Sequence, residues 1–138
     1  MDQPASPAPR RDARPDGTQD SRLLALVVEG ETILRIATAD LLAEAGFEVL
    51  EAWSAPTATR QIERHGGLRL AIVDADLAGP RGRFALARDI AARWPALSLI
   101  VLSAGASPAP GDLPDRVRFA PKPLSDVLAR QAWERLAG

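Results

Sequence analysis

The feature that most constrains the fold is a repeated alternation of short apolar runs with longer segments of helical periodicity. Continuous apolar runs occur at residues 23–28 (LLALVV), 68–73 (LRLAIV) and 97–102 (LSLIVL). A run that is apolar on both faces is typical of a strand buried within a parallel sheet. The helical segments between the runs would then cover both sides of that sheet.

Residues that favour helix starts and helix ends lie at the boundaries between the apolar runs and the helical segments. Gly46 is a plausible end of the first helix, and Pro95 stops the third. Ser54 and Ser125 are suited to cap the second and last helices through their hydroxyl groups. The predicted strands are 23–28, 47–52, 68–73, 97–102 and 117–120, and the predicted helices are 33–45, 54–65, 84–94 and 125–136.

One helix of the alternation is missing from the pattern. Residues 104–116 (AGASPAPGDLPDR) contain three prolines and two glycines, which disfavour a regular helix. We therefore predict an α/β, flavodoxin-like doubly wound (βα)5 fold whose fourth helix is short or irregular. Its five-stranded parallel sheet would have the order 2-1-3-4-5, and ligands bind such sheets at the carboxyl ends of the strands.

Composition limits the domain organisation and the class of function. Residues 1–21 contain four prolines and almost no large apolar side chain, so we expect a disordered tail before a folded domain at 22–138. The net charge of -1 gives no indication of nucleic-acid binding. The chain has no cysteine, one histidine (His65), no membrane-length apolar run and no signal core. We expect a cytoplasmic protein without membrane or nucleic-acid partners.

Polar residues gather after four of the predicted strands, where the topology would bring them together. Lys122 follows the fifth strand and is the only lysine beside sixteen arginines, which suggests a position where arginine would not serve. The sheet order places these groups around Asp74. They are Glu29-Gly30-Glu31, Asp74-Ala75-Asp76, Ser103-Ala104 and Lys122-Pro123.

Four short motifs resemble those of bacterial two-component response-regulator receiver domains. VVEGE is similar to the acidic turn of that family, AIVDADLAGPRG to its phosphoacceptor strand and loop, LSA to its hydroxyl position and FAPKP to its lysine motif. The resemblance covers about residues 23–136. Each motif alone is weak, but their order and spacing match the strand ends.

The resemblance implies a role for each residue. Asp74 would be the phosphoacceptor, and Lys122 would place a positive charge beside it. Ser103 and the Ala104 amide would contact a phosphoryl oxygen. Phe119 would be an aromatic switch that turns inward as Ser103 moves toward the phosphate, and Lys122-Pro123 would be a cis peptide.

The acidic turn departs from the family pattern. Glu29 matches its first acid, but Gly30 stands where the second acid directly binds Mg²⁺. The remaining predicted ligands are Asp74, the Asp76 backbone carbonyl and Glu29 through water, so we expect weak Mg²⁺ binding and slow phosphorylation. The Glu31 or Asp76 side chain could substitute. Ala78 also replaces a proline that is usual in the family.

The leading hypothesis is a single-domain receiver, not an enzyme. A histidine kinase or phosphotransfer protein would donate the phosphoryl group, and a downstream protein target would be contacted by a monomer or weak dimer. One alternative is a phosphorylation-independent pseudo-receiver. A remote alternative is a haloacid-dehalogenase-like phosphatase, for which Asp112 and Asp115 have the wrong spacing.

Two further assignments concern residues away from the acidic cluster. Arg81, Arg83, Arg88 and Arg93 are expected to form a solvated face of the third helix. Trp133 on the last helix could belong either to the core or to an interface, and the sequence leaves both readings open.

Overall fold

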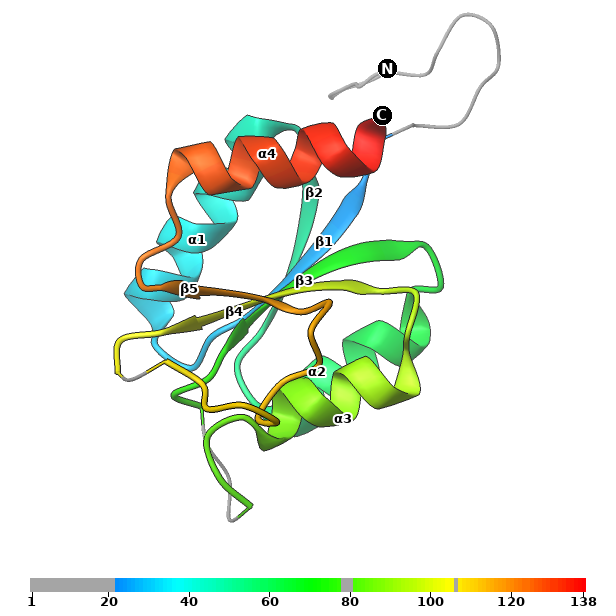
Figure 1. Cartoon of the computed structure of the whole chain (residues 1–138). Helices are drawn as coiled ribbons and strands as arrows, with labels where there is room; N and C mark the ends of the chain where they lie inside the picture. Colours follow the sequence, from blue (N-terminus) through cyan, green and yellow to red (C-terminus); the bar gives the residue numbers. More distant parts are fainter. Residues whose placement is uncertain (1–21, 78–80, 106) are drawn as a thin grey trace, which may run out of the picture.

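A computed structural model of the chain describes residues 22–77, 81–105 and 107–138. The predicted disordered tail and the Ala78 position lie outside these residues. Figure 1 shows the elements in chain order. They are β1 (Leu24–Val28), α1 (Thr32–Ala45), β2 (Glu48–Ala52), α2 (Ala55–Arg64), β3 (Leu68–Asp74), α3 (Ala85–Arg93), β4 (Ser98–Ser103), β5 (Arg118–Pro121) and α4 (Asp126–Ala137).

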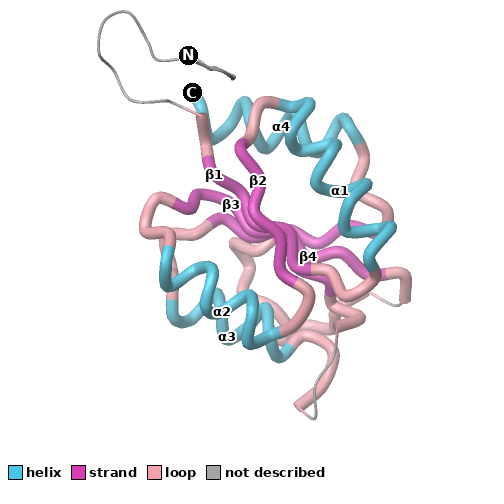
Figure 2. The backbone as a smooth tube through the Cα atoms, turned by 180° about the vertical axis from the view of Figure 1, so that it is seen from behind, coloured by secondary structure: helices cyan, strands magenta, loops and turns pink. Residues whose placement is uncertain are grey.

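The five strands form one parallel sheet in the order β2-β1-β3-β4-β5, which confirms the predicted topology. Helices α1 and α4 cover one face, and α2 and α3 cover the other (Figures 1 and 2). Parallel strands need crossover connections, and these helices supply three of the four. None of the described helices is long and apolar enough to cross a bilayer.

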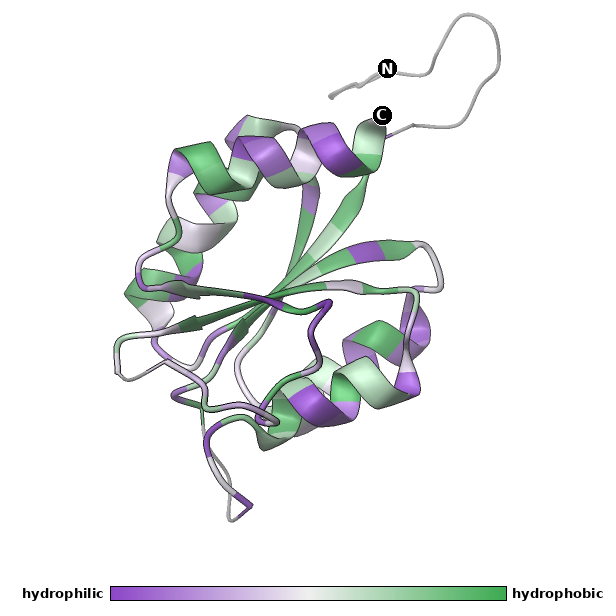
Figure 3. Ribbon diagram, in the orientation of Figure 1, coloured by the Kyte–Doolittle hydropathy of each residue, from purple (hydrophilic) through white to green (hydrophobic). Residues whose placement is uncertain are grey.

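Side chains that alternate along each strand divide the core into two layers. Val28, Val73 and Val101 are neighbours in register and pack toward α2 and α3. The residues one position earlier, Val27, Ile72 and Ile100, pack toward α1 and α4. All six side chains are buried, and the apolar colour of the central strands is visible in Figure 3. Burial on both faces explains why these runs are continuously apolar in the sequence.

The segment between β4 and β5 forms turns rather than a helix in its described residues, as the prolines and glycines predicted. Two arginines tie it to the α3 side of the molecule. Arg88 donates to the Asp112 carbonyl at 3.3 Å, and Arg116 donates to the Ala91 carbonyl at 2.8 Å. These bonds hold the segment in place without helical hydrogen bonds of its own.

Both predicted serine caps are present at helix starts. The Ser54 hydroxyl accepts from the Thr57 amide at 3.2 Å, and the Thr57 hydroxyl accepts from the Ser54 amide at 2.9 Å, completing a capping box. The Ser125 hydroxyl accepts from the Leu128 amide at 3.0 Å. These bonds satisfy amides that the first helical turn leaves free.

Gly46 and Trp133 fit together where α1 meets α4. Gly46 ends α1 with a φ of 124°, a conformation that favours glycine. A Cβ atom at this position would lie 2.6 Å from the Trp133 Nε1 atom. Trp133 packs against the core layer of α1 and α4, which answers the question that the sequence left open in favour of the core.

We expect Gly46→Ala to lower the free energy of unfolding by about 2–4 kcal/mol, because it adds both backbone strain and a clash with the indole. Urea denaturation measures the change. Gly66→Ala is the matched control, since a Cβ there would meet no atom within 4 Å, and its effect should stay within about 0.5 kcal/mol. Equal losses in the two variants would contradict the assigned packing.

Candidate functional site

A partly buried lysine, Lys122, contacts three acidic side chains at the carboxyl ends of the strands. Lys122 follows β5, and its amide donates to the Ser103 carbonyl at the end of β4 (3.0 Å). Its Nζ atom lies 2.8 Å from Asp74 Oδ1, 3.1 Å from Glu29 Oε1 and 3.5 Å from Asp76 Oδ2. The side chain therefore reaches past β4 to groups on β3 and β1, as the predicted sheet order requires.

Burial makes the charges of this cluster depend on one another. Asp74 and Glu29 are each only 6% exposed. Burial raises the pKa of Glu29 above its usual value, and the charge of Asp74 adds to this effect. Burial also acts to lower the pKa of Lys122, but hydrogen bonds to Asp74 and Glu29 outweigh it and raise that pKa. Lys122 is therefore a fixed ammonium ion between two carboxyl groups.

The acidic turn after β1 is shaped around Glu29. Its Oε2 atom accepts from the Glu31 amide at 3.0 Å, while the Glu31 side chain is exposed. A Cβ atom at Gly30 would lie 3.1 Å from Leu77 Cδ1. A leucine methyl group thus borders the position where the family pattern has an acid.

The Asp76 side chain makes the contacts that the resemblance to receiver domains assigns to a phosphoryl group. Its Oδ1 atom accepts from the Ser103 hydroxyl at 2.9 Å, and its Oδ2 atom accepts from the Ala104 amide at 2.9 Å. The amide of Asp76 itself donates to Asp74 Oδ1 at 2.7 Å. The resemblance predicts only a metal-binding role for Asp76, through its backbone carbonyl or, as a substitute ligand, its side chain.

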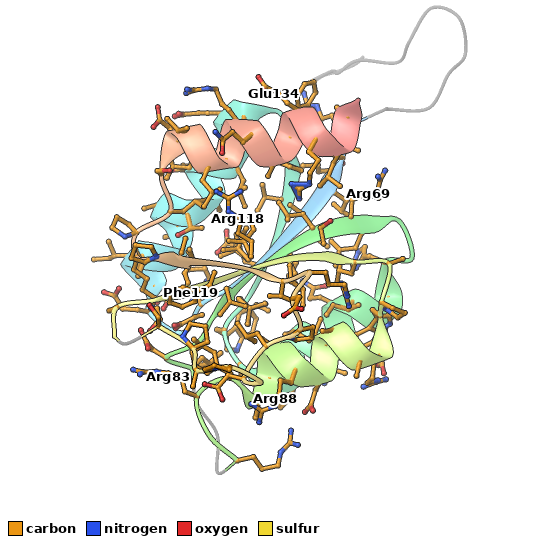
Figure 4. All side chains as sticks on the ribbon, viewed as in Figure 1. Arg69, Arg83, Arg88, Arg118, Phe119 and Glu134 are labelled. Carbon is orange, nitrogen blue, oxygen red and sulfur yellow. The ribbon has the colours of Figure 1, made fainter. Side chains whose placement is uncertain are left out.

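Arg83 completes the surroundings of Asp76. Its Nη2 atom lies 3.0 Å from Asp76 Oδ1. The prediction that Arg81 and Arg83 lie on the third helix is wrong, because α3 begins only at Ala85. Both side chains are exposed, but the Arg83 guanidinium turns to the Asp76 carboxylate. Figure 4 shows Arg83 and Phe119 at the end of the sheet toward which the strands point.

Several donors set the ionisation of Asp76. Burial tends to raise its pKa, but the Ala104 amide and the Ser103 hydroxyl, followed by the charges of Lys122 and Arg83, outweigh burial and lower the pKa below its usual value. Its carboxylate is therefore stabilised as the anion.

Ser103 and Phe119 lie on the neighbouring strands β4 and β5, where Phe119 pairs with Val101 and Ser103 pairs with Pro121. The Ser103 side chain is fully buried. The Phe119 ring is partly buried and packs edge-on against Phe84, with ring centroids 6.3 Å apart at 73°. The Lys122-Pro123 peptide is cis, as the resemblance implied.

The oxygen donors near Asp74 suit a hard cation such as Mg²⁺ by type, but they are few. Within the described residues, no group of three acidic, histidine or cysteine side chains is arranged to hold a metal. Lys122 already contacts all three nearby carboxylates. This donor set fits a weakly held ion rather than a tight site.

We expect Asp76→Asn to lower the free energy of unfolding by about 1 kcal/mol at neutral pH, because it loses one of two hydrogen-bond acceptors. Since the pKa of Asp76 is lowered in the folded state, its stabilising effect exists above the unfolded pKa of about 3.9. That effect is lost as the pH falls through the folded pKa. Urea denaturation at a series of pH values should show the two proteins converging in acid, and a constant difference would contradict this.

Solved structures with the same architecture were found by comparison, although no family model and no curated protein matches the chain. A CheY-like response regulator receiver domain from Methylobacillus flagellatus aligns with a TM-score of 0.72 at 18% identity, covering 84% of this chain and 99% of that one. A receiver domain protein from Clostridium thermocellum aligns at 0.63 and 21% identity, covering 83% and 97%.

A third structure has somewhat higher sequence identity. The receiver domain of NtrX from Brucella abortus aligns with a TM-score of 0.63 at 25% identity, covering 80% of this chain and 95% of that one. The strand order, the helix placement and these alignments all indicate the same fold. The chain therefore has the fold of the response regulator receiver domains.

Proposed function

We propose that this chain is the receiver of a phosphorelay, in which Asp74 accepts a phosphoryl group from a histidine kinase or phosphotransfer protein. The observation that carries the proposal is the partly buried Lys122 ammonium, 2.8 Å from Asp74 Oδ1. The Ser103 hydroxyl and the Ala104 amide lie close by, where both donate to Asp76. A downstream protein target would then distinguish the phosphorylated from the free form by contact. The structural neighbours named as receiver domains support this role.

The proposed step joins a carboxylate oxygen of Asp74 to phosphorus. The phosphorus–nitrogen bond of the donor histidine breaks, and its electron pair stays on the imidazole. Lys122 reduces the repulsion between the two anions and remains protonated because its pKa is raised. Ser103 and Ala104 would donate to the oxygens of the acyl phosphate once Asp76 has left them.

We also propose that Mg²⁺ assists this site but binds weakly. The ion would neutralise charge on the phosphoryl oxygens. Asp74 and the Asp76 carbonyl would hold it, with Glu29 contributing through water. Gly30 contributes no ligand. Lys122 and backbone amides would therefore do most of the positioning of the phosphoryl group.

A phosphorylation-independent binding module is the second candidate. One observation favours it: the Asp76 carboxylate already engages Ser103 and Ala104. No observation on the described residues favours the phosphatase alternative: the Asp112 carboxylate accepts the Ala109 amide at 2.7 Å within its own loop.

Incubation with acetyl phosphate or an active histidine kinase, in the presence of Mg²⁺, should add the mass of one phosphoryl group to the intact protein. Asp74→Asn should abolish the gain, because the amide is not a nucleophile toward phosphorus. Intact-protein mass spectrometry measures both. If an active kinase leaves the wild-type mass unchanged, the binding-module candidate replaces the receiver function.

Gly30→Asp should raise the affinity for Mg²⁺ by about tenfold, because it adds a carboxylate ligand to a donor set that is short of one. Titration followed by amide chemical shifts or Trp53 fluorescence measures the change. Gly30→Ala is the matched control, since its Cβ makes the same 3.1 Å contact with Leu77 but brings no oxygen. An equal gain in both variants would show that the missing carboxylate is not the cause of weak binding.

A further inference from the structure

We propose that the Asp76 carboxylate is a built-in ligand of the phosphoryl-binding groups and competes with the phosphoryl group for them. The contacts of Asp76 with these groups are seen in the structure. The inference that Asp76 competes with a phosphoryl group rests on the proposed function. Asp76 would thereby slow phosphorylation of Asp74 and hold the site in an occupied arrangement without phosphate.

The contacts of Asp76 form a nearly complete set for an oxyanion. One oxygen accepts the Ser103 hydroxyl, and the other accepts the Ala104 amide, both at 2.9 Å. Lys122 lies 3.5 Å from one oxygen and Arg83 lies 3.0 Å from the other. A hydroxyl, a backbone amide and two cations around one group match the geometry that binds phosphoryl oxygens. A carboxylate that uses all four leaves none of them free for a second anion.

The surroundings of Asp76 hold its side chain in this position. Arg83 passes so close to Gly105 that a Cβ atom there would lie 2.5 Å from its Nη2 atom. The Gly105 amide also donates to the Ser103 hydroxyl oxygen at 2.9 Å, which orients the hydroxyl proton toward Asp76. The glycine thus permits the arginine to close over the carboxylate, and the hydroxyl is fixed from both sides.

Ser103 already has the orientation expected of an occupied site. It is fully buried and donates its hydroxyl proton to an anion. In the receiver proposal, Ser103 would make the same bond to a phosphoryl oxygen. The Asp76 carboxylate takes the place of that oxygen in the free protein.

The occupancy is tested by titrating inorganic phosphate, as an oxyanion probe, into wild-type protein, Asp76→Ala and Asp76→Asn. The Ala104 and Gly105 amide shifts in ¹H–¹⁵N spectra report binding. Removing the competing carboxylate should lower the phosphate concentration at half-saturation by about tenfold in Asp76→Ala, because more of the protein is competent to bind. Asp76→Asn keeps one acceptor oxygen and should show a smaller gain, and it serves as the test if the alanine variant does not fold.

Asp89→Asn is the matched control for loss of one negative charge. Asp89 pairs with Arg81 in an exposed ion pair, as Asp76 pairs with Arg83. It should bind phosphate as the wild-type protein does. Equal half-saturation in wild-type protein and both Asp76 variants would overturn the proposal, as would the absence of a saturable shift in every variant.

This outcome is separable from that of the receiver proposal, because the titration involves no phosphoryl transfer. Where Asp74 does accept phosphate, a second readout is the rate of mass gain with acetyl phosphate. Asp76→Asn should be phosphorylated about threefold faster than Asp89→Asn, in keeping with its smaller gain in phosphate affinity. A rate in Asp76→Asn equal to or below that of the control would count against competition.

Discussion

The Lys122 ammonium is the interaction on which the candidate site depends. Three carboxylates from two different strand ends surround it, and two of them are buried. Without a positive charge, Glu29 and Asp74 would be like charges out of water, an arrangement that proteins avoid by taking up protons. The lysine therefore permits acidic residues to be brought together at one end of the sheet.

The same ammonium connects the fold to the chemistry. Lys122 can reach Asp74 only because β5 lies beside β4 and β4 lies beside β3. Its backbone amide is fixed to the Ser103 carbonyl, so the two residues cannot separate without loss of a sheet-end hydrogen bond. The order of the strands thus determines which charged side chains meet at their carboxyl ends.

Much of this arrangement could be predicted from the sequence, because it follows from periodicity and topology. Runs such as 97–102 indicate buried strands, and the strand order then places Asp74, Ser103 and Lys122 together. Strand and helix ends differ from the predicted ones by about one residue, as is usual for such boundaries. The missing helix between β4 and β5 followed from prolines and glycines, whose backbone preferences are local.

The role of the Asp76 side chain could not be predicted in the same way. Its position depends on which of several donors it meets, and those donors come from β4, β5 and the Arg83 loop. The sequence did not indicate the pairing of Arg83 with Asp76, because spacing along the chain does not show that α3 begins only at Ala85. A weak signal existed in Gly105, where a glycine follows Ser103-Ala104 and makes room for a neighbour.

The turns between β4 and β5 have a consequence for the unfolded chain. Pro108, Pro110 and Pro114 each fix one backbone angle whether or not the protein is folded. The denatured ensemble therefore has fewer conformations to lose in this segment, and ordering it costs less entropy than ordering a flexible loop of equal length. The lower entropy cost of ordering this segment thus offsets part of the stability that it lacks because it has no helical hydrogen bonds.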